Sequence, residues 1–212
     1  MDGLDLLKKD WKKRESSLPH LSYNQIYQML WKRSSSIVKW IFVISIIEFL
    51  FWALITVFMA DHEYWEEMER IHLKEFTVAT YVINYGITFF FIFCFYKNYR
   101  KISSTDNAAQ LMKNILRTRK TVKYYIGYIL ISTALVALIY TYFMMDYHIS
   151  STTVEDIEKY SFTPLQWLMF AVIMIGGLAV FLGLIWLFYR VIYGILLRRL
   201  NNNYKELKKL EV

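Results

Sequence analysis

The sequence predicts an all-α, polytopic membrane protein with four transmembrane helices and a cytoplasmic helical collar. Of 212 residues, 56% are hydrophobic and only two are proline. The apolar residues gather in four blocks of 21 to 25 residues, at 37–59, 76–96, 122–145 and 165–189. A helix of that length measures about 31 to 38 Å and can cross a hydrocarbon core of about 30 Å. The blocks are apolar on nearly every side, whereas the helices of a soluble bundle keep a polar stripe.

The distribution of charge predicts the orientation. Lys and Arg total 22 in residues 1–39, 97–123 and 190–212, but only three in residues 60–75 and 146–163. Because short cationic loops stay on the cytoplasmic side, both termini and the middle loop are expected inside and the two acidic loops, 60–75 and 146–164, outside. The net charge of +7 then suits anionic lipid headgroups at the inner surface. No motif that reads nucleic acid accompanies the basic residues, so we expect no nucleic-acid partner.

The cytoplasmic segment 1–36 predicts two amphipathic helices. The first has an apolar face and a basic surround, and could contact either the inner leaflet or a protein partner. Its candidate contact residues are Leu4, Leu7, Trp11, Lys8, Lys9 and Lys12. The second helix opens at Ser22, where Ser22 and Gln25 have the spacing of a capping box.

The middle loop 97–121 and the C-terminal segment 190–212 should continue the membrane helices into the cytoplasm. After a turn at residues 103–106, an apolar helical stripe begins at Ala108. In the C-terminal segment, apolar residues spaced by four and three form a heptad seam, which includes Leu197, Leu200 and Leu207. Two heptads are marginal as a free coiled coil. The seam is therefore expected to pack within the molecule, or alternatively to form a homodimer.

Glu48 stands near the middle of the first span, where an ionised carboxylate is costly. Measured from the cytoplasmic ends of the spans, other polar or small residues fall at a similar depth of about 16 Å. They are Asn84, Ser132, Thr133, Gly176 and Gly177. This midplane layer could be interhelical hydrogen bonding, or a proton or ion site in which Asn84 is the partner of Glu48. Ala179 and Gly183 have the spacing of a small-residue packing face.

Three histidines fall on the outer side near carboxylates, which makes a divalent metal site conceivable there. The candidate ligands are His62, His72, His148, Asp61 and Asp146. Their spacing matches no compact ligand motif, and the single cysteine, Cys94, offers no thiol pair. The glycine-rich, serine-elbow and zinc-protease templates of enzymes are missing from the sequence. We therefore expect no metal, no cofactor and no enzymatic activity.

Two stretches carry a resemblance. Residues 4–13 read Leu-Asp-Leu-Leu-Lys-Lys-Asp-Trp-Lys-Lys, and residues 37–48 read Ile-Val-Lys-Trp-Ile-Phe-Val-Ile-Ser-Ile-Ile-Glu. With the Tyr-rich helix between them, this layout resembles uncharacterised four-span inner-membrane proteins of Bacteroidetes-type bacteria. The resemblance implies a bacterial inner membrane and carries over no catalytic residues.

These observations favour a non-enzymatic inner-membrane scaffold or regulator that binds a protein partner through the collar. An anti-sigma-like tether is one version of this function. The alternative is a small transporter or channel subunit with Glu48 and Asn84 as its proton or ion site.

Overall fold

The computed structural model describes residues 8, 10, 22–104, 107–151 and 163–210, without the side chains of 148–151 and 210. The elements in this part of the chain are α helices. They are α2 (Tyr23–Met59), α3 (His62–Arg70), α4 (Lys74–Ser103), α5 (Ala108–Ser151) and α7 (Pro164–Leu210). All of them except α3 are long and apolar enough to cross a membrane. The structure thus confirms the all-α class and the four candidate spans.

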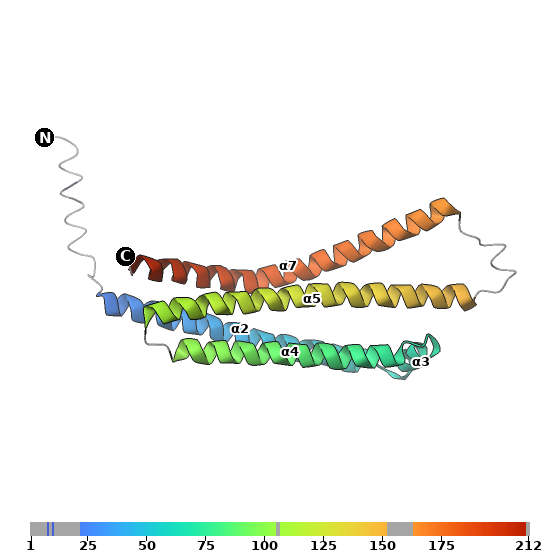
Figure 1. Cartoon of the computed structure of the whole chain (residues 1–212), viewed down its shortest axis with the longest axis horizontal. Coiled ribbons are helices and arrows are strands. Elements are labelled where there is room, and N and C mark those ends of the chain that lie inside the picture. Colours follow the sequence, from blue (N-terminus) through green and yellow to red (C-terminus); the bar gives the residue numbers. More distant parts are fainter. Residues whose placement is uncertain (1–7, 9, 11–21, 105–106, 152–162, 211–212) are drawn as a thin grey trace.

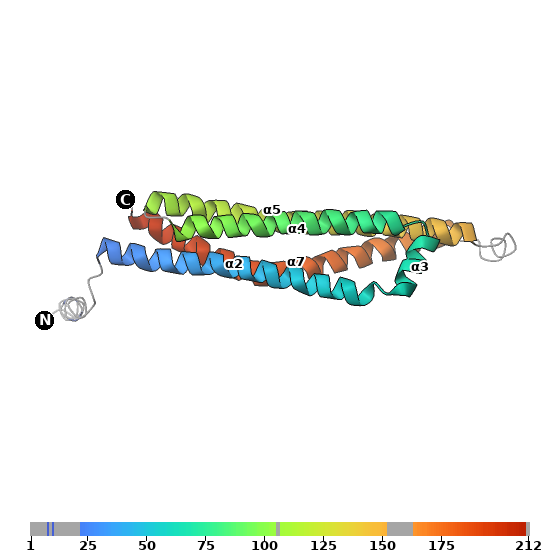
Figure 2. The same ribbon diagram turned by 90° about the horizontal axis from the view of Figure 1, so that it is seen from below.

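The four long helices form an elongated antiparallel bundle (Figures 1 and 2). The start of α2, the end of α7 and the turn between α4 and α5 lie together at one end, here called the terminal end; α3 lies at the far end (Figure 1). Helices α5 and α7 contain 44 and 47 residues, or about 66 and 70 Å at 1.5 Å per residue. Both helices are therefore about twice as long as the hydrocarbon core of a bilayer is thick.

Local sequence signals explain where the helices begin and end. Ser22 caps α2 in a complete capping box with Gln25, as predicted from their spacing. Helix α3, which was not expected inside the acidic loop, begins where the Asp61 side chain accepts a hydrogen bond from the Tyr64 backbone at 2.9 Å. Between α3 and α4, His72 has a φ of 56°, a left-handed conformation that reverses the chain.

A hydrophobic core fills the bundle toward its terminal end. Its fully buried residues come from all four long helices; they are Val38, Ile41, Phe95, Ile102, Leu111, Ile115, Val122, Tyr193, Leu200 and Leu207. Hydrogen bonds between helices accompany this packing: the Asn203 amide donates to Ser34 at 3.0 Å, and the Trp31 indole donates to the carbonyl of Ile102 at 2.9 Å. The terminal end is therefore a packed helical assembly and not four separate extensions.

Helix α7 changes its surroundings along its length. From Tyr189 to Leu207 it contributes buried residues to the core, whereas residues 163–177 are exposed at every position. In Figure 1 this first half diverges from α5. The far end has its own small core, in which Met68 of α3 is buried together with Ile71 and Leu73 of the turn that follows.

Candidate functional site

Glu48 is the buried acidic residue at the centre of the candidate site. It belongs to the face of α2 that also carries Ile41 and Ser45, since spacings of four and three residues bring side chains to one side of a helix. Its side chain is 8% exposed. The Tyr189 hydroxyl donates to Oε1 of Glu48, and the Tyr193 hydroxyl donates to Oε2 at 2.9 Å. Both carboxyl oxygens therefore accept a hydrogen bond from α7.

The tyrosines that hold Glu48 form an aromatic cluster with α5. Tyr189 and Tyr193, four residues apart, stack with ring centroids 5.9 Å apart and an interplanar angle of 20°. The Tyr125 ring meets both of them at 6.1 Å, and it also contacts Phe95 of α4 edge to face at 5.5 Å. Hydrogen bonds at the site therefore join α7 to α2, and ring packing joins α7 to α5 and α5 to α4. This arrangement fixes the rotation of α7 about its axis.

Chemically, the cluster offers one carboxyl group and several hydroxyl groups. Within the described part of the chain, no Lys, Arg or His forms an ion pair with Glu48. Such a group of oxygen atoms can exchange a proton or contact a small cation, and it can equally act as an interhelical latch.

The structure does not place the predicted midplane layer in one plane. Asn84 is not bonded to Glu48; its Oδ1 accepts from the Tyr128 hydroxyl at 2.7 Å and its Nδ2 donates to the Thr80 carbonyl at 2.9 Å. The reason is the relative height of the helices. Tyr189 is level with Glu48, so the predicted residues of α7, Gly176 and Gly177, lie 12 to 13 residues farther along the helix, or about 18 to 20 Å away.

The other members of that layer are also displaced. Ser132 and Thr133 follow Tyr125 on α5 by seven and eight residues, or about 10 to 12 Å, and the Ser132 hydroxyl bonds within its own helix to the Ile129 carbonyl at 3.1 Å. The polar groups are staggered along the bundle. Asn84 with Tyr128 links α4 to α5, while Glu48 with its tyrosines links α2 to α7.

The small-residue face predicted at Ala179 and Gly183 has no helix against it. Ala179 is exposed, and a Cβ placed on Gly183 would meet no atom within 4 Å. The same is true of Gly176 and Gly177. The first half of α7 diverges from α5 (Figure 1), and in the described part of the chain no helix packs against these residues.

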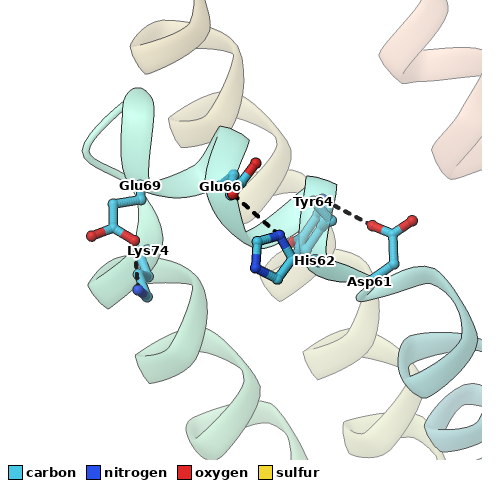
Figure 3. A network of polar contacts seen from close by, with 6 residues as sticks. All are labelled: Asp61, His62, Tyr64, Glu66, Glu69 and Lys74. Carbon is cyan, nitrogen blue, oxygen red and sulfur yellow. Dashed lines mark hydrogen bonds and ion pairs between the residues drawn. The ribbon is translucent and has the colours of Figure 1, made fainter.

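The outer histidines and carboxylates are engaged separately (Figure 3). His62 pairs with Glu66 through Nδ1 and Oε1 at 3.2 Å, and Asp61 caps α3. His72 forms the turn before α4, Asp146 is an exposed residue of α5, and the side chain of His148 lies outside the described residues. Among the residues that the structure describes, no three His, Cys, Asp or Glu side chains gather as metal ligands would.

The proposed contact residues of the first helix mostly fall outside the described residues. Those outside are Leu4, Leu7, Trp11, Lys9 and Lys12; Lys8 is described and exposed. At the other terminus, Leu200 and Leu207 are fully buried, and Leu197 is partly buried against the same core. The heptad seam therefore packs within the chain, against α5 and α2, which is the first of the two arrangements expected for it.

Sequence reasoning missed the partners of Glu48. Tyr125 and Tyr189 fall inside the apolar blocks 122–145 and 165–189, and Tyr193 lies just beyond the second of these blocks. The available signal was the pair Tyr189 and Tyr193, whose spacing of four residues directs two hydroxyl groups to one side of α7. Without the height of α7 relative to α2, that pair could not be assigned to Glu48.

Comparisons with known proteins address the family and not the activity. No curated protein matches the chain, and no solved structure matches it. One family model, described as a domain of unknown function (DUF8845), matches residues 24–212. This match covers the four long helices, the aromatic cluster and Glu48. The chain belongs to the DUF8845 family.

Proposed function

We propose that this chain is a non-enzymatic scaffold or regulator of a bacterial inner membrane, which binds a protein partner through its helical collar. The collar is defined here as residues 22–36, 97–104, 107–121 and 190–210. The observation that carries the proposal is the packing of these segments around one buried core, which includes Ile102, Leu111, Leu200 and Leu207. Helices that serve only to cross a bilayer do not need this additional length.

The collar supports binding because it is preorganised. Besides the bonds of Asn203 and Trp31, the Arg119 guanidinium donates to Asn201 Oδ1 at 2.6 Å and connects α5 to α7. A surface held in this way loses little conformational entropy when a partner docks. Its apolar seam is already occupied, and its exposed charged groups are mainly basic. They include Lys32, Arg33, Lys113, Arg117, Lys120, Arg198, Arg199, Lys205, Lys208 and Lys209. An acidic protein surface would complement them.

The proposed orientation places the collar in the cytoplasm and α3 outside. Its support is the excess of Lys and Arg at the terminal end. In a Cys94→Ser background, single cysteines at Glu66 and Lys113 would test it, because both side chains are exposed. A membrane-impermeant maleimide should label Glu66→Cys from outside in intact cells, and Lys113→Cys only after permeabilisation. Equal labelling of both from the same side would overturn the orientation and the cytoplasmic collar together.

Site-specific photocrosslinking in cells tests the partner. A photoreactive residue at Arg117 or Lys205, both exposed on the collar, should give a discrete protein adduct. The matched control is Val180, which is 65% exposed on the diverging half of α7 and should give none. The adduct should persist in Glu48→Gln and weaken in Lys208→Glu with Lys209→Glu. Identical adducts from Val180, or none from the collar, would contradict the proposal.

A second candidate function is that of a small proton- or cation-coupled transporter, or a subunit of a channel. The observation that favours it is Glu48, a buried acid within a tyrosine cluster, located where α7 passes from the core to its exposed half. In proteoliposomes, Glu48→Gln should then abolish proton-coupled flux while purification and helix content remain unchanged. Tyr128→Phe provides a control that removes a hydroxyl from the neighbouring Asn84 bond. Flux that survives in Glu48→Gln would leave the scaffold function as the one to pursue.

A further inference from the structure

We propose that Arg190 holds the phosphate of an anionic phospholipid against the surface of α7. Arg190 is the only charged residue between positions 164 and 197. It follows Tyr189, whose hydroxyl bonds to Glu48, and precedes the next basic residue, Arg198, by eight residues or about 12 Å. Arg190 is therefore the cation of α7 nearest to the apolar half of this helix, at the boundary between that half and the collar.

The Arg190 side chain is exposed and points away from the basic end of the molecule. Its Cζ lies 4.7 Å from the centre of the Trp186 ring, one turn back along α7. Trp186 is itself 45% exposed. Within the described chain, the guanidinium has no carboxylate at ion-pair distance and no hydrogen-bond acceptor. Its five N–H groups are thus available to a ligand outside the chain.

An exposed guanidinium at the boundary between a lipid-facing segment and the collar is suited to an anionic partner. An arginine without one is costly in hydrocarbon, and membranes reduce the cost by thinning locally and bringing headgroups to the charge. A phosphate accepts two parallel hydrogen bonds from the arginine fork, and the indole ring holds the guanidinium plane from the other side. Among the groups of a bilayer, the phosphate is the anion that can reach this surface.

The surface beside Arg190 has room for a headgroup. Arg190, Gly194 and Arg198 are spaced by four residues and share one face of α7. Gly194 has no side chain, and a Cβ added there would approach Arg190 Cγ to 3.7 Å, which is ordinary contact. The face therefore presents two cations on either side of a low point. A lipid with a net negative charge complements that pattern, whereas a zwitterionic lipid offers the same phosphate together with a cation that the second arginine repels.

Native mass spectrometry of the full-length protein tests this site. The protein is titrated with phosphatidylglycerol and, separately, with phosphatidylcholine of the same acyl chains. One phosphatidylglycerol should bind about tenfold or more tightly than phosphatidylcholine, because both lipids offer a phosphate to Arg190 but only phosphatidylcholine also brings a choline cation against this cationic face. Arg190→Gln should remove this preference. Arg190→Lys should keep part of it, because Lys retains the charge but not the fork.

Two further variants separate a built site from general attraction. Gly194→Leu keeps every charge but fills the low point, and should lower the preference for phosphatidylglycerol about as much as Arg190→Gln. Arg199→Gln removes one exposed charge from a different face of α7 and should leave it unchanged. Equal effects of Arg190→Gln and Arg199→Gln would overturn the proposal in favour of diffuse electrostatics. Displacement of the lipid by millimolar inorganic phosphate would instead identify a soluble anion as the ligand.

Folding is checked by helix content and monodispersity. If Arg190→Gln fails to fold, Gly194→Leu and Arg190→Lys still decide the result, because Leu replaces Gly in a helix favourably and Lys preserves the charge. The inference requires that the helices lie in a bilayer and does not depend on a collar partner. A negative photocrosslinking result would therefore leave it standing, and loss of lipid preference would leave the collar proposal untouched.

Discussion

Replacement of Glu48 by Leu should destabilise the bundle by about 1 to 3 kcal/mol. The change removes the acceptors of two buried hydroxyl groups, those of Tyr189 and Tyr193, which are 3% and 0% exposed. In membrane proteins one interhelical hydrogen bond contributes about 0.6 kcal/mol on average and about 1.7 at most. Two such bonds give the expected range, because Leu keeps most of the volume of the Glu side chain.

A double-mutant cycle isolates the bond itself. Tyr193→Phe should cost about 1 kcal/mol in the parent protein and close to zero in Glu48→Leu, because its acceptor is then already missing. The free energy of unfolding is measured in mixed micelles by titration with sodium dodecyl sulfate, followed by circular dichroism. Tyr128→Phe is the control, since its hydroxyl bonds to Asn84, and its cost should add to that of Glu48→Leu.

Additive costs for Tyr193→Phe and Glu48→Leu would refute the geometry of the site. They would mean that the Tyr193 hydroxyl and the Glu48 carboxyl group do not interact in the folded protein, even if each substitution is destabilising by itself. A coupling energy of at least about 0.5 kcal/mol in this pair, absent from the control pair, is the result that the structure requires.

Three more predictions concern regions outside the tyrosine cluster. Leu207→Ala in the collar core should cost about 2 to 5 kcal/mol, whereas Lys208→Ala, which is exposed beside it, should stay within about 0.5; chemical unfolding compares the two. Burial, with the neighbouring hydroxyl of Tyr81, raises the pKa of Tyr64 above its ordinary 10.0, so the folded state keeps the phenolic proton to a higher pH than the unfolded state. The contribution of Tyr64 to stability should therefore be complete below pH 10 and decrease above it. Tyr64→Phe should remove this decrease in thermal melts. The hydrogen bond from Lys74 lowers the pKa of Glu69 below 4.5, so the pair stabilises the folded state above pH 4.5 and this stabilisation is lost as the pH falls. In Lys74→Gln, the titration of the Glu69 carboxylate, followed by NMR, should return to its ordinary range.

The four long apolar helices could be predicted because their signals are local. Hydropathy over about twenty residues identifies a membrane helix without reference to its neighbours. The capping box at Ser22 and the stripe from Ala108 likewise depend on a few adjacent residues, and the structure shows both, in α2 and α5. Helix α3 could have been found in the same way, from the Asp61 cap and the helical spacing of Tyr64, Trp65 and Met68 among charged residues.

The composition of the site could not be predicted because it depends on the heights of helices relative to one another. Depth was counted from the charged end of each block, which treats Arg190 as a marker of the membrane surface. The structure shows that Tyr189, at the last position of the fourth block, is level with Glu48, which lies 11 residues into the first block. This single assumption displaced α7 by about 12 residues and replaced Tyr189 with Gly177 in the predicted layer. Register between antiparallel helices comes from side-chain packing along their whole length, which local patterns do not contain.

The point on α7 that contacts Glu48 of α2 connects the two candidate functions physically. On one side of the cluster, α7 is packed into the collar core through Leu200 and Leu207; on the other, its residues are exposed. The bonds from Tyr189 and Tyr193 therefore attach α7 to α2 close to the point where the helix diverges. Loss of these bonds should loosen the diverging half first, because the collar retains its own core and its own bonds from Asn203 and Arg119. A scaffold would tolerate that change, since its binding surface remains folded, whereas a transporter would lose the carboxyl group on which its coupling depends.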